Sequence, residues 1–199
     1  MYKLVLLRHG RSLADDEEKI EGRYDSPLTD VGIDQAKSTK IVFSELKYEF
    51  DAIITSTLKR AMQTAEVINE KYKVPIIKCD LLIERDNGVL AGLKRKDADL
   101  KYPIPIDITP FSLFPDRSGE SLILLQSRAM LAIEFIIRNS PGRYLIVSHG
   151  NFLNAMIRVI LGISNPNNES GCIFNFEDNS YIEMDYFEEK NKWIIKRFV

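Results

Sequence analysis

The chain has 199 residues, of which 45% are hydrophobic, so it is long enough to bury one sizeable core. Its 27 Lys and Arg residues nearly balance its 29 Asp and Glu residues, which argues against a non-specific nucleic-acid binder. No apolar run approaches the roughly 18 residues of a membrane-spanning helix, and the first residues lack a signal-peptide pattern, so a membrane partner is not expected.

The first half of the chain alternates short apolar runs with helical patterns. The apolar runs predict strands buried on both faces of a sheet. The expected strands are Lys3–Leu7, Asp51–Thr55 and Ile76–Lys78. Ser and Thr are typical helix N-caps, and they mark where the helices begin. The expected helices run from a cap at Thr29 to about Leu46, and from a cap at Ser56 or Thr57 to about Tyr72.

The second half begins with an irregular region over residues 82–118, which is long for a loop and is typical of a functional lid. Its basic and aromatic residues suit either an acidic or an aromatic phosphate ester. A solvated basic turn next to aromatic core residues of the lid is the simpler interpretation. They are Lys94, Arg95, Lys96, Tyr102, Phe111 and Phe114. After it we expect helices at Leu122–Arg138 and Phe152–Leu161, and strands at Tyr144–Val147, Gly171–Phe176, Tyr181–Tyr186 and Trp193–Phe198.

This order of elements predicts an α/β fold. Alternating buried strands and helices favour a three-layer sandwich with a mainly parallel sheet and helices on both faces. Short turns join the C-terminal strands, so at least one strand is antiparallel to its neighbour. We expect a single catalytic domain over residues 1–199, with the lid inserted near residues 82–118.

The two histidines of the chain share one context. His9 and His149 each directly follow an apolar strand and each precede a glycine. Ligands of open α/β sheets bind outside the carboxyl ends of the strands. A single histidine at such a place often only caps the strand end, but two in matching contexts predict a shared site.

Two arginines bring positive charge to the same region. Arg8 precedes His9, and Arg60 lies in the first turn expected of the helix after the second strand. A cation there opposes the helix dipole unless an anion is bound, and guanidinium groups match phosphate oxygens in geometry and charge. A solvated surface arginine is the less favoured alternative for Arg60 taken alone. Together with the two histidines, the arginines predict a pocket for a tetrahedral dianion.

A proton donor for a leaving oxygen is the remaining requirement. Glu84 follows an apolar run and opens the lid region, where partial burial raises the pKa of a carboxyl towards the range of a general acid. Asp86 is the rival for this role. A simple ion pair with a neighbouring arginine is the alternative for Glu84.

Several segments together resemble the histidine phosphatase superfamily, in its phosphoglycerate mutase-like branch. They occur in the family's order and span residues 3 to about 162. The matching segments are Leu-Arg-His-Gly at 7–10, the segment 22–36 into the first helix, Ser-Thr-Leu-Lys-Arg-Ala at 56–61, Ser-Gly-Glu-Ser at 118–121 and Val-Ser-His-Gly at 147–150.

This resemblance implies a phosphatase that acts on a small-molecule phosphomonoester. His9 would attack phosphorus and form a phosphohistidine, while Glu84 would protonate the leaving alcohol and then deprotonate the hydrolytic water. The phosphoryl oxygens would be held by Arg8, Arg60, His149 and the backbone N–H of Asn151. The arginines supply the positive charge, so no metal and no cofactor are expected.

Two cysteines complete the inventory of reactive side chains. Cys79 and Cys172 lie far apart and form no CxxC pair, which favours a reduced, cytoplasmic protein without structural zinc. The oligomeric state is left open.

Two positions depart from the family pattern. Relatives commonly carry Asn and Gln where this chain has Asp15 and Glu21. An ionised carboxylate repels a phosphate dianion and donates no hydrogen bond. Either these side chains turn away, or the substrate brings a cationic or hydroxyl-rich group. The run 15–18 is more simply a solvated acidic loop, with Arg11 as a compensating charge.

Two other functions compete with the phosphatase. A cofactor-dependent phosphoglycerate mutase would need a lid that excludes water, and strong mutases have a longer span between the acid and the second histidine than Glu84–His149. A non-catalytic member that binds a phospho-ligand or a protein is disfavoured because the residues of the expected chemistry are all present.

Overall fold

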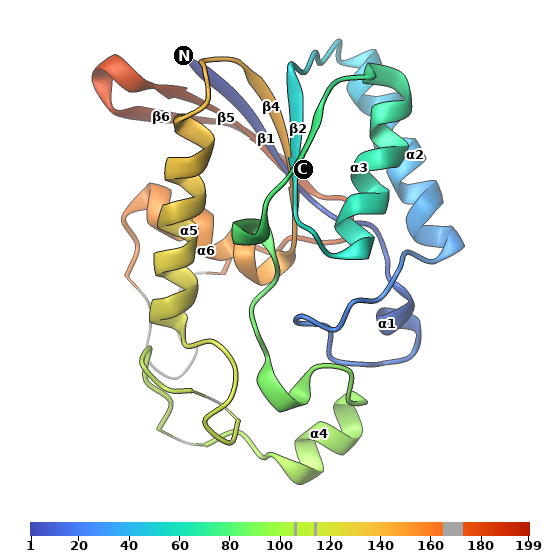
Figure 1. Cartoon of the computed structure of the whole chain (residues 1–199), viewed down its shortest axis with the longest axis vertical. Coiled ribbons are helices and arrows are strands. Elements are labelled where there is room, and N and C mark those ends of the chain that lie inside the picture. The colour runs from blue at the N-terminus through green and yellow to red at the C-terminus, as the bar shows by residue number, and fades with distance from the viewer. Residues whose placement is uncertain (106, 114, 165–172) are drawn as a thin grey trace.

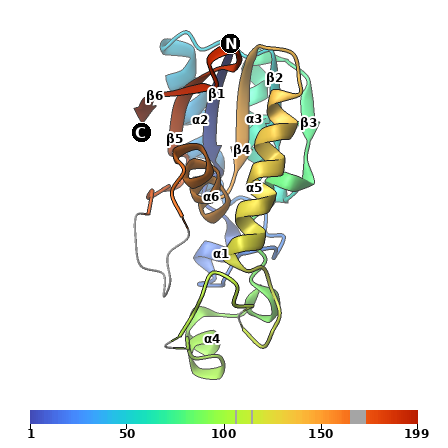
Figure 2. The same ribbon diagram turned by 90° about the vertical axis from the view of Figure 1, so that its left-hand side faces the viewer.

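The computed structural model describes residues 1–105, 107–113, 115–164 and 173–199. A six-stranded sheet lies at the centre, with helices on both faces (Figures 1 and 2). Its strands are β1 (Tyr2–Arg8), β2 (Ala52–Thr55), β3 (Ile76–Lys78), β4 (Arg143–Ser148), β5 (Tyr181–Phe187) and β6 (Lys192–Phe198). The helices are α1 (Leu13–Asp16), α2 (Asp30–Glu45), α3 (Lys59–Tyr72), α4 (Arg95–Lys101), α5 (Leu122–Ile137) and α6 (Gly150–Leu161).

The sheet is mixed, in the order β3-β2-β4-β1-β5-β6. Neighbouring strands from β3 to β1 pair in parallel, whereas β5 is antiparallel to both β1 and β6. The helices provide the long crossovers that parallel pairs require, and a short turn suffices between β5 and β6. Asn191 in that turn has a positive φ of 41°, a conformation that Asn tolerates well. The predicted α/β architecture is confirmed.

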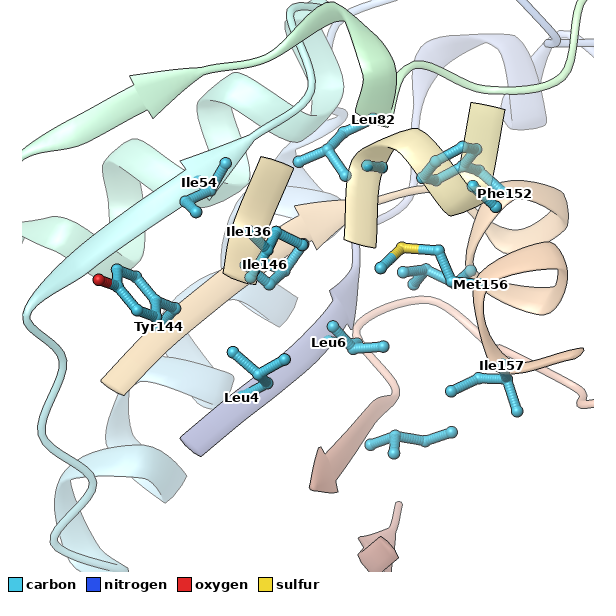
Figure 3. Close-up of a cluster of buried hydrophobic side chains, with 14 of the residues drawn as sticks. Leu4, Leu6, Ile54, Leu82, Ile136, Tyr144, Ile146, Phe152, Met156 and Ile157 are labelled. Carbon is cyan, nitrogen blue, oxygen red and sulfur yellow. The ribbon is translucent and has the colours of Figure 1, made fainter. Parts of the chain in front are cut away.

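Burial on both faces of the sheet explains the continuous apolar run of β1. Leu4 and Leu6 pack into one cluster with residues of α5 and α6 (Figure 3). Val5 and Leu7 belong to a second cluster, on the α2 and α3 side. Since successive side chains of a strand point to opposite faces, both sets are buried at once. This packing fixes the carboxyl end of β1, where His9 begins the site.

The start of α3 differs from its prediction. The N-cap is Leu58, not Ser56 or Thr57, and it makes no side-chain cap. Both hydroxyls have other partners, because Ser56 Oγ contacts His149 Nε2 and Thr57 Oγ donates to Asp80. The first backbone N–H of the helix donates instead to Asp25, over 2.7 Å.

The expected strand at Gly171–Phe176 is not found in its described part, since residues 173–176 are not in a strand and 171–172 lie outside the described residues. Asn154 explains this, because its side-chain amide pairs with both the N–H and the carbonyl of Phe174. A side chain on α6 therefore replaces the strand partner. Phe114 and Cys172 also lie outside the described residues.

The acidic segment after the first histidine is ordered by a helix that the sequence interpretation missed. Ser12 caps α1 by accepting from the Asp15 N–H, and Asp15 accepts from the Ser12 N–H in return. Such a reciprocal capping box fixes a helix start. Asp15 is therefore held in place, which corrects its interpretation as part of a solvated loop.

The region expected as a lid contains short helices. It begins after a 3-10 turn at Asp80–Leu82, continues through another at Gly88–Leu90, and carries α4. Backbone hydrogen bonds join Ile20 to Leu93 and to Gly92, so the region is tied to the segment after α1. Figure 1 shows α4 at the far end of the molecule, beyond α1. In the described part of the chain, no helix is long and apolar enough to cross a membrane.

Candidate active site

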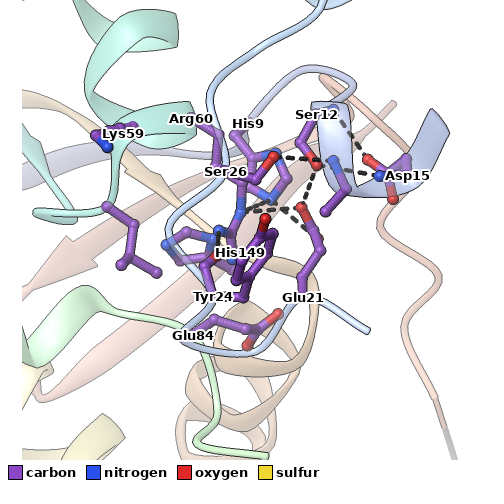
Figure 4. Close-up of polar contacts among 12 residues, drawn as sticks. His9, Ser12, Asp15, Glu21, Tyr24, Ser26, Lys59, Arg60, Glu84 and His149 are labelled. Atoms are coloured by element: carbon purple, nitrogen blue, oxygen red, sulfur yellow. Dashed lines mark hydrogen bonds and ion pairs between the residues drawn. The ribbon is translucent and has the colours of Figure 1, made fainter. Parts of the chain in front are cut away.

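The two histidines meet at the carboxyl edge of the sheet. His9 follows β1 and His149 follows β4, which are hydrogen-bonded neighbours. Their ring centroids are 4.9 Å apart and both residues are fully buried. Arg60, in the first turn of α3, is fully buried against them (Figure 4). The structure therefore brings together three of the residues that the sequence predicted for the site.

Hydrogen bonds give the two ring nitrogens of His9 different roles. Nδ1 lies 2.7 Å from the carbonyl oxygen of Gly10, so in the neutral ring Nδ1 carries the proton and donates it there. Nε2 keeps its lone pair and accepts from Arg60 Nε over 3.1 Å. Burial, with Arg60 and Arg8 nearby, lowers the pKa of His9 well below its usual value. His9 is thus neutral, with Nε2 unprotonated and its lone pair directed at the Arg60 N–H.

Arg60 is held rigidly by several acceptors. NH1 donates to the Tyr24 carbonyl over 2.9 Å, and NH2 donates to the Gly22 carbonyl over 2.8 Å. Its Nε also lies 3.1 Å from a carboxylate oxygen of Glu21. The segment between α1 and α2 therefore fixes the guanidinium beside His9 Nε2.

Ser56 orients the second histidine. Its hydroxyl lies 2.8 Å from His149 Nε2 and accepts from the Leu58 N–H. When Ser56 donates to Nε2, the proton of the neutral ring is on Nδ1, which is buried with no partner among the described residues. Burial and Arg60 lower the pKa of His149 well below its usual value. His149 thus presents a free N–H donor.

Glu84 lies against the N-terminus of α6. Its carboxylate accepts from the backbone N–H groups of Arg85 over 2.7 Å, Phe152 over 3.0 Å and Asn151 over 3.2 Å. Burial raises its pKa above the usual value, although these hydrogen bonds oppose the rise. One of these donors, Asn151, lies two residues after His149, and the charge of Arg60 also acts on the carboxyl (Figure 4). Glu84 therefore lies at the same end of the sheet as the histidines, and it binds a proton more readily than a free carboxyl.

Asp86 is engaged elsewhere. Its carboxylate accepts from the Gly88 N–H over 2.8 Å and pairs with Arg23 over 3.1 Å. The side chain is about one-third exposed. Among the two acids that the sequence left open, only Glu84 is buried at the site.

Arg8 faces the site with part of its guanidinium. NH1 donates to the Phe176 carbonyl over 2.6 Å, and NH2 pairs with Asp178 over 3.0 Å. Its Nε is buried with no hydrogen-bond partner among the described residues. This buried N–H is a donor available to an anion.

A family model described as the histidine phosphatase superfamily (branch 1) matches residues 4–197. The chain belongs to the histidine phosphatase superfamily. It is 31% identical over 199 residues to an uncharacterized phosphatase, PhoE, of Bacillus subtilis, covering 100% of this chain and 94% of that protein. With this membership and this relative, the chain is a phosphoric monoester hydrolase.

Solved structures share the histidine phosphatase fold. A mycobacterial glucosyl-3-phosphoglycerate phosphatase matches with a TM-score of 0.79 at 20% identity, covering 98% of each chain. A phosphoserine phosphatase of Entamoeba histolytica matches with a TM-score of 0.73 at 22% identity, covering 100% of this chain and 96% of that one. Both carry small phosphate esters in their names.

The two acids that depart from the histidine phosphatase pattern face the site. An open cleft of about 280 Å³ lies beside the buried histidines. Its charged lining residues are Arg8, Asp15, Glu21, Glu84 and Arg95. Of the three basic residues at 94–96, only Arg95 lines this cleft. Lys94 and Lys96 are exposed, but they lie at the start of α4 and not in the predicted turn. Of the two alternatives that the sequence left open for Asp15 and Glu21, the one in which both side chains turn away is not met.

Several residues of this histidine phosphatase site were not identified from the sequence. The sequence indicates Ser56 only as a helix cap, and it does not point to Asp178. Asp178 lies in the loop before β5 and carries no local signal, because 170 residues separate it from its partner Arg8 along the chain. Within the described ranges, no group of three His, Cys, Asp or Glu side chains is arranged to hold a metal ion.

Proposed function

We propose that this chain hydrolyses small-molecule phosphomonoesters through a phosphohistidine formed at His9 Nε2. The observation that carries the proposal is the hydrogen bond from His9 Nδ1 to the Gly10 carbonyl. It leaves the lone pair on Nε2, and burial beside Arg60 keeps the ring neutral. A neutral imidazole with a fixed orientation is the form that attacks phosphorus.

In the first step, Nε2 attacks phosphorus and the bond from phosphorus to the ester oxygen breaks. Glu84 gives its proton to the departing alkoxide, which leaves as an alcohol. The raised pKa of Glu84 favours the protonated form that this step needs. In the second step, a water attacks phosphorus and passes a proton to Glu84, the Nε2–P bond breaks, and orthophosphate is released.

Cationic and N–H donors stabilise the charge on the equatorial oxygens in both steps. The residues proposed for this are Arg8, Arg60, His149 and the backbone N–H of Asn151. Arg8 Nε and His149 Nδ1, which have no hydrogen-bond partner within the described part of the chain, supply donors. The Asn151 N–H donates to Glu84 in this structure, so its proposed role requires that Glu84 release it. The proposal also includes a small-molecule substrate. It includes a cytoplasmic location, which the cysteine pattern favours.

Trapping with a labelled phosphate ester tests the proposal. After an acid-free quench, the wild-type protein is expected to carry phosphate on histidine, and His9→Ala is expected to carry none. His149→Ala serves as the comparison, because it removes the other site histidine but leaves the nucleophile, so labelling slows without vanishing. Circular dichroism checks that each variant is folded.

The same measurement separates the competing functions. A phosphatase passes the label to water as inorganic phosphate, whereas a mutase returns it to an organic acceptor. A non-catalytic member takes up no label. Unchanged turnover by His9→Ala would refute the mechanism.

A further inference from the structure

Glu21 lies against the proposed nucleophile. Its Oε1 accepts from Ser12 Oγ over 2.6 Å and lies 3.1 Å from Arg60 Nε. Its Oε2 lies 3.8 Å from His9 Nε2, the atom at which the phosphoryl group would be attached. The side chain is only 12% exposed and points into the site in Figure 4. A bound phosphoryl group and this carboxylate therefore compete for the space beside His9 Nε2 and for the positive charge of Arg60.

Counting Glu21 itself, four carboxylates and three guanidinium groups gather at this position. The groups that face it from neighbouring elements are His9 and Arg8 at the end of β1, Asp15 in α1, Arg60 in α3, Glu84 after η1 (Asp80–Leu82), Asp178 before β5 and Arg95 at the start of α4. Both histidines at the site are neutral, so they add no positive charge. A phosphate dianion attached at His9 Nε2 meets the Glu21 carboxylate at close range, and two negative charges there repel each other.

We propose that the phosphoryl group binds together with one proton, shared between a phosphoryl oxygen and Glu21 Oε2. This rests on the proposed function, because it places the phosphoryl group on His9. The proton arrives either as the P–OH of a phosphate monoanion or on the carboxyl of Glu21, and the bound complex is the same. Glu21 is thus a specificity-determining residue that selects the protonated phosphoryl group over the free dianion.

Replacing Glu21 by Gln tests this with little disturbance. The amide oxygen keeps the hydrogen bond from Ser12 Oγ and the contact with Arg60 Nε when it takes the place of Oε1, because only an acceptor fits opposite these donors. The amide NH₂ then stands where Oε2 was and donates to a phosphoryl oxygen without any added proton. Glu17→Gln is the matched control, since Glu17 makes the same class of ion pair with Lys19 but is 40% exposed at the surface.

Calorimetry with inorganic phosphate counts the protons directly. Titrations are run at pH about 8, where the dianion predominates, in buffers with different ionisation enthalpies. The wild-type protein and Glu17→Gln are expected to take up about one proton per phosphate bound, and Glu21→Gln is expected to take up close to none. Thermal unfolding with and without phosphate confirms that each variant is folded and binds.

The pH profile gives a second readout that a structural role would not change. The substrate is p-nitrophenyl phosphate, whose leaving group departs without a proton and so removes the general acid from the profile. Wild-type kcat/KM is expected to fall about tenfold per pH unit above the phosphate pKa of about 6. Glu21→Gln is expected to lose this slope and to exceed the wild type by about tenfold or more at pH about 8.

Two results would overturn the inference. If wild-type binding takes up no proton, Glu21 moves aside instead. If Glu21→Gln still takes up about one proton, another carboxyl such as Glu84 carries it. The calorimetry needs no turnover, so a protein that binds phosphate with proton uptake but hydrolyses no ester would refute the proposed function and leave this inference supported.

Discussion

Replacing Glu84 by Gln separates the proposed general acid from its structural surroundings. The carboxylate accepts three backbone N–H groups, from Arg85, Asn151 and Phe152. The first and third share Oε1, so the amide oxygen of Gln keeps them when it takes that position. Only the N–H of Asn151, which lies 3.2 Å from Oε2, then meets an amide donor.

The effect on stability is expected to be small. One lost hydrogen bond costs about 0.5–1.5 kcal/mol. Burial raises the pKa of Glu84, so its carboxylate is disfavoured in the fold and a neutral amide recovers part of this loss. By linkage, protonated Glu84 stabilises the fold below its unfolded pKa, and this contribution is lost as pH rises through the raised folded pKa. Near neutral pH, the unfolding free energy of Glu84→Gln is therefore expected to lie within about 1.5 kcal/mol of the wild-type value.

The effect on activity is expected to be much larger and to depend on the leaving group. General acid–base catalysis typically contributes about 10²–10⁴-fold, or about 2.7–5.4 kcal/mol of barrier. An alkyl phosphate needs the proton and loses this factor in Glu84→Gln. An aryl phosphate loses less in the first step, but its phosphoenzyme accumulates because the hydrolytic water lacks its base.

The assay compares kcat/KM for an alkyl and an aryl phosphate, with quenched phosphoenzyme measured in parallel. Asp86→Asn is the matched control, because Asp86 pairs with Arg23 and lies outside the proposed chemistry. It is expected to keep the wild-type dependence on leaving group. If Asp86→Asn produces the leaving-group-dependent loss and Glu84→Gln does not, the acid is misassigned.

Two more outcomes follow from the site. Treatment with EDTA is expected to leave the rate of hydrolysis unchanged, because the proposed cationic charge comes from arginines. A loss of activity that added metal restores would mean that the two histidines are metal ligands. Ser56→Ala removes the hydrogen bond to His149 Nε2 and is expected to lower kcat/KM by about threefold to tenfold with the fold intact. Thr57→Ala, which loses a hydrogen bond to Asp80 instead, is expected to keep a kcat/KM near the wild-type value. An equal loss of kcat/KM in both variants would mean that the effect comes from the start of α3 and not from His149.

The fold and the meeting of the histidines were predictable because the signals are local and mutually consistent. Apolar runs of the length of β1 and β4 determine buried strands, and residues that follow parallel neighbours must share an edge. His9 and His149 met for that reason, and Arg60 followed from its place at the start of α3. Glu84 was left beside Asp86 as an alternative, because periodicity does not distinguish which of two nearby acids points inward.

The wrong predictions for the start of α3 and for the strand at Gly171–Phe176 have a common cause, which is competition for hydrogen-bond partners. Ser56 and Thr57 are good caps by residue type, but each hydroxyl has a tertiary partner that no local pattern reveals. The residues 173–176 have strand composition, yet Asn154 takes the Phe174 backbone groups that a strand neighbour would need. Only the Ser12–Asp15 capping box was within reach of the sequence, because Ser-x-x-Asp is a known helix-start pattern.

The role proposed for Glu21 depends on both the sequence and the structure. From the sequence, an acid in place of an amide was a departure with two explanations, one of which made it irrelevant by turning it away. The structure removes that explanation, since Oε1 is held by Ser12 and Arg60. What is left is an electrostatic conflict inside a phosphate site, and a proton resolves it with the smallest change in geometry. The substitution thus acts on the charge state of the substrate, not on the identity of the nucleophile.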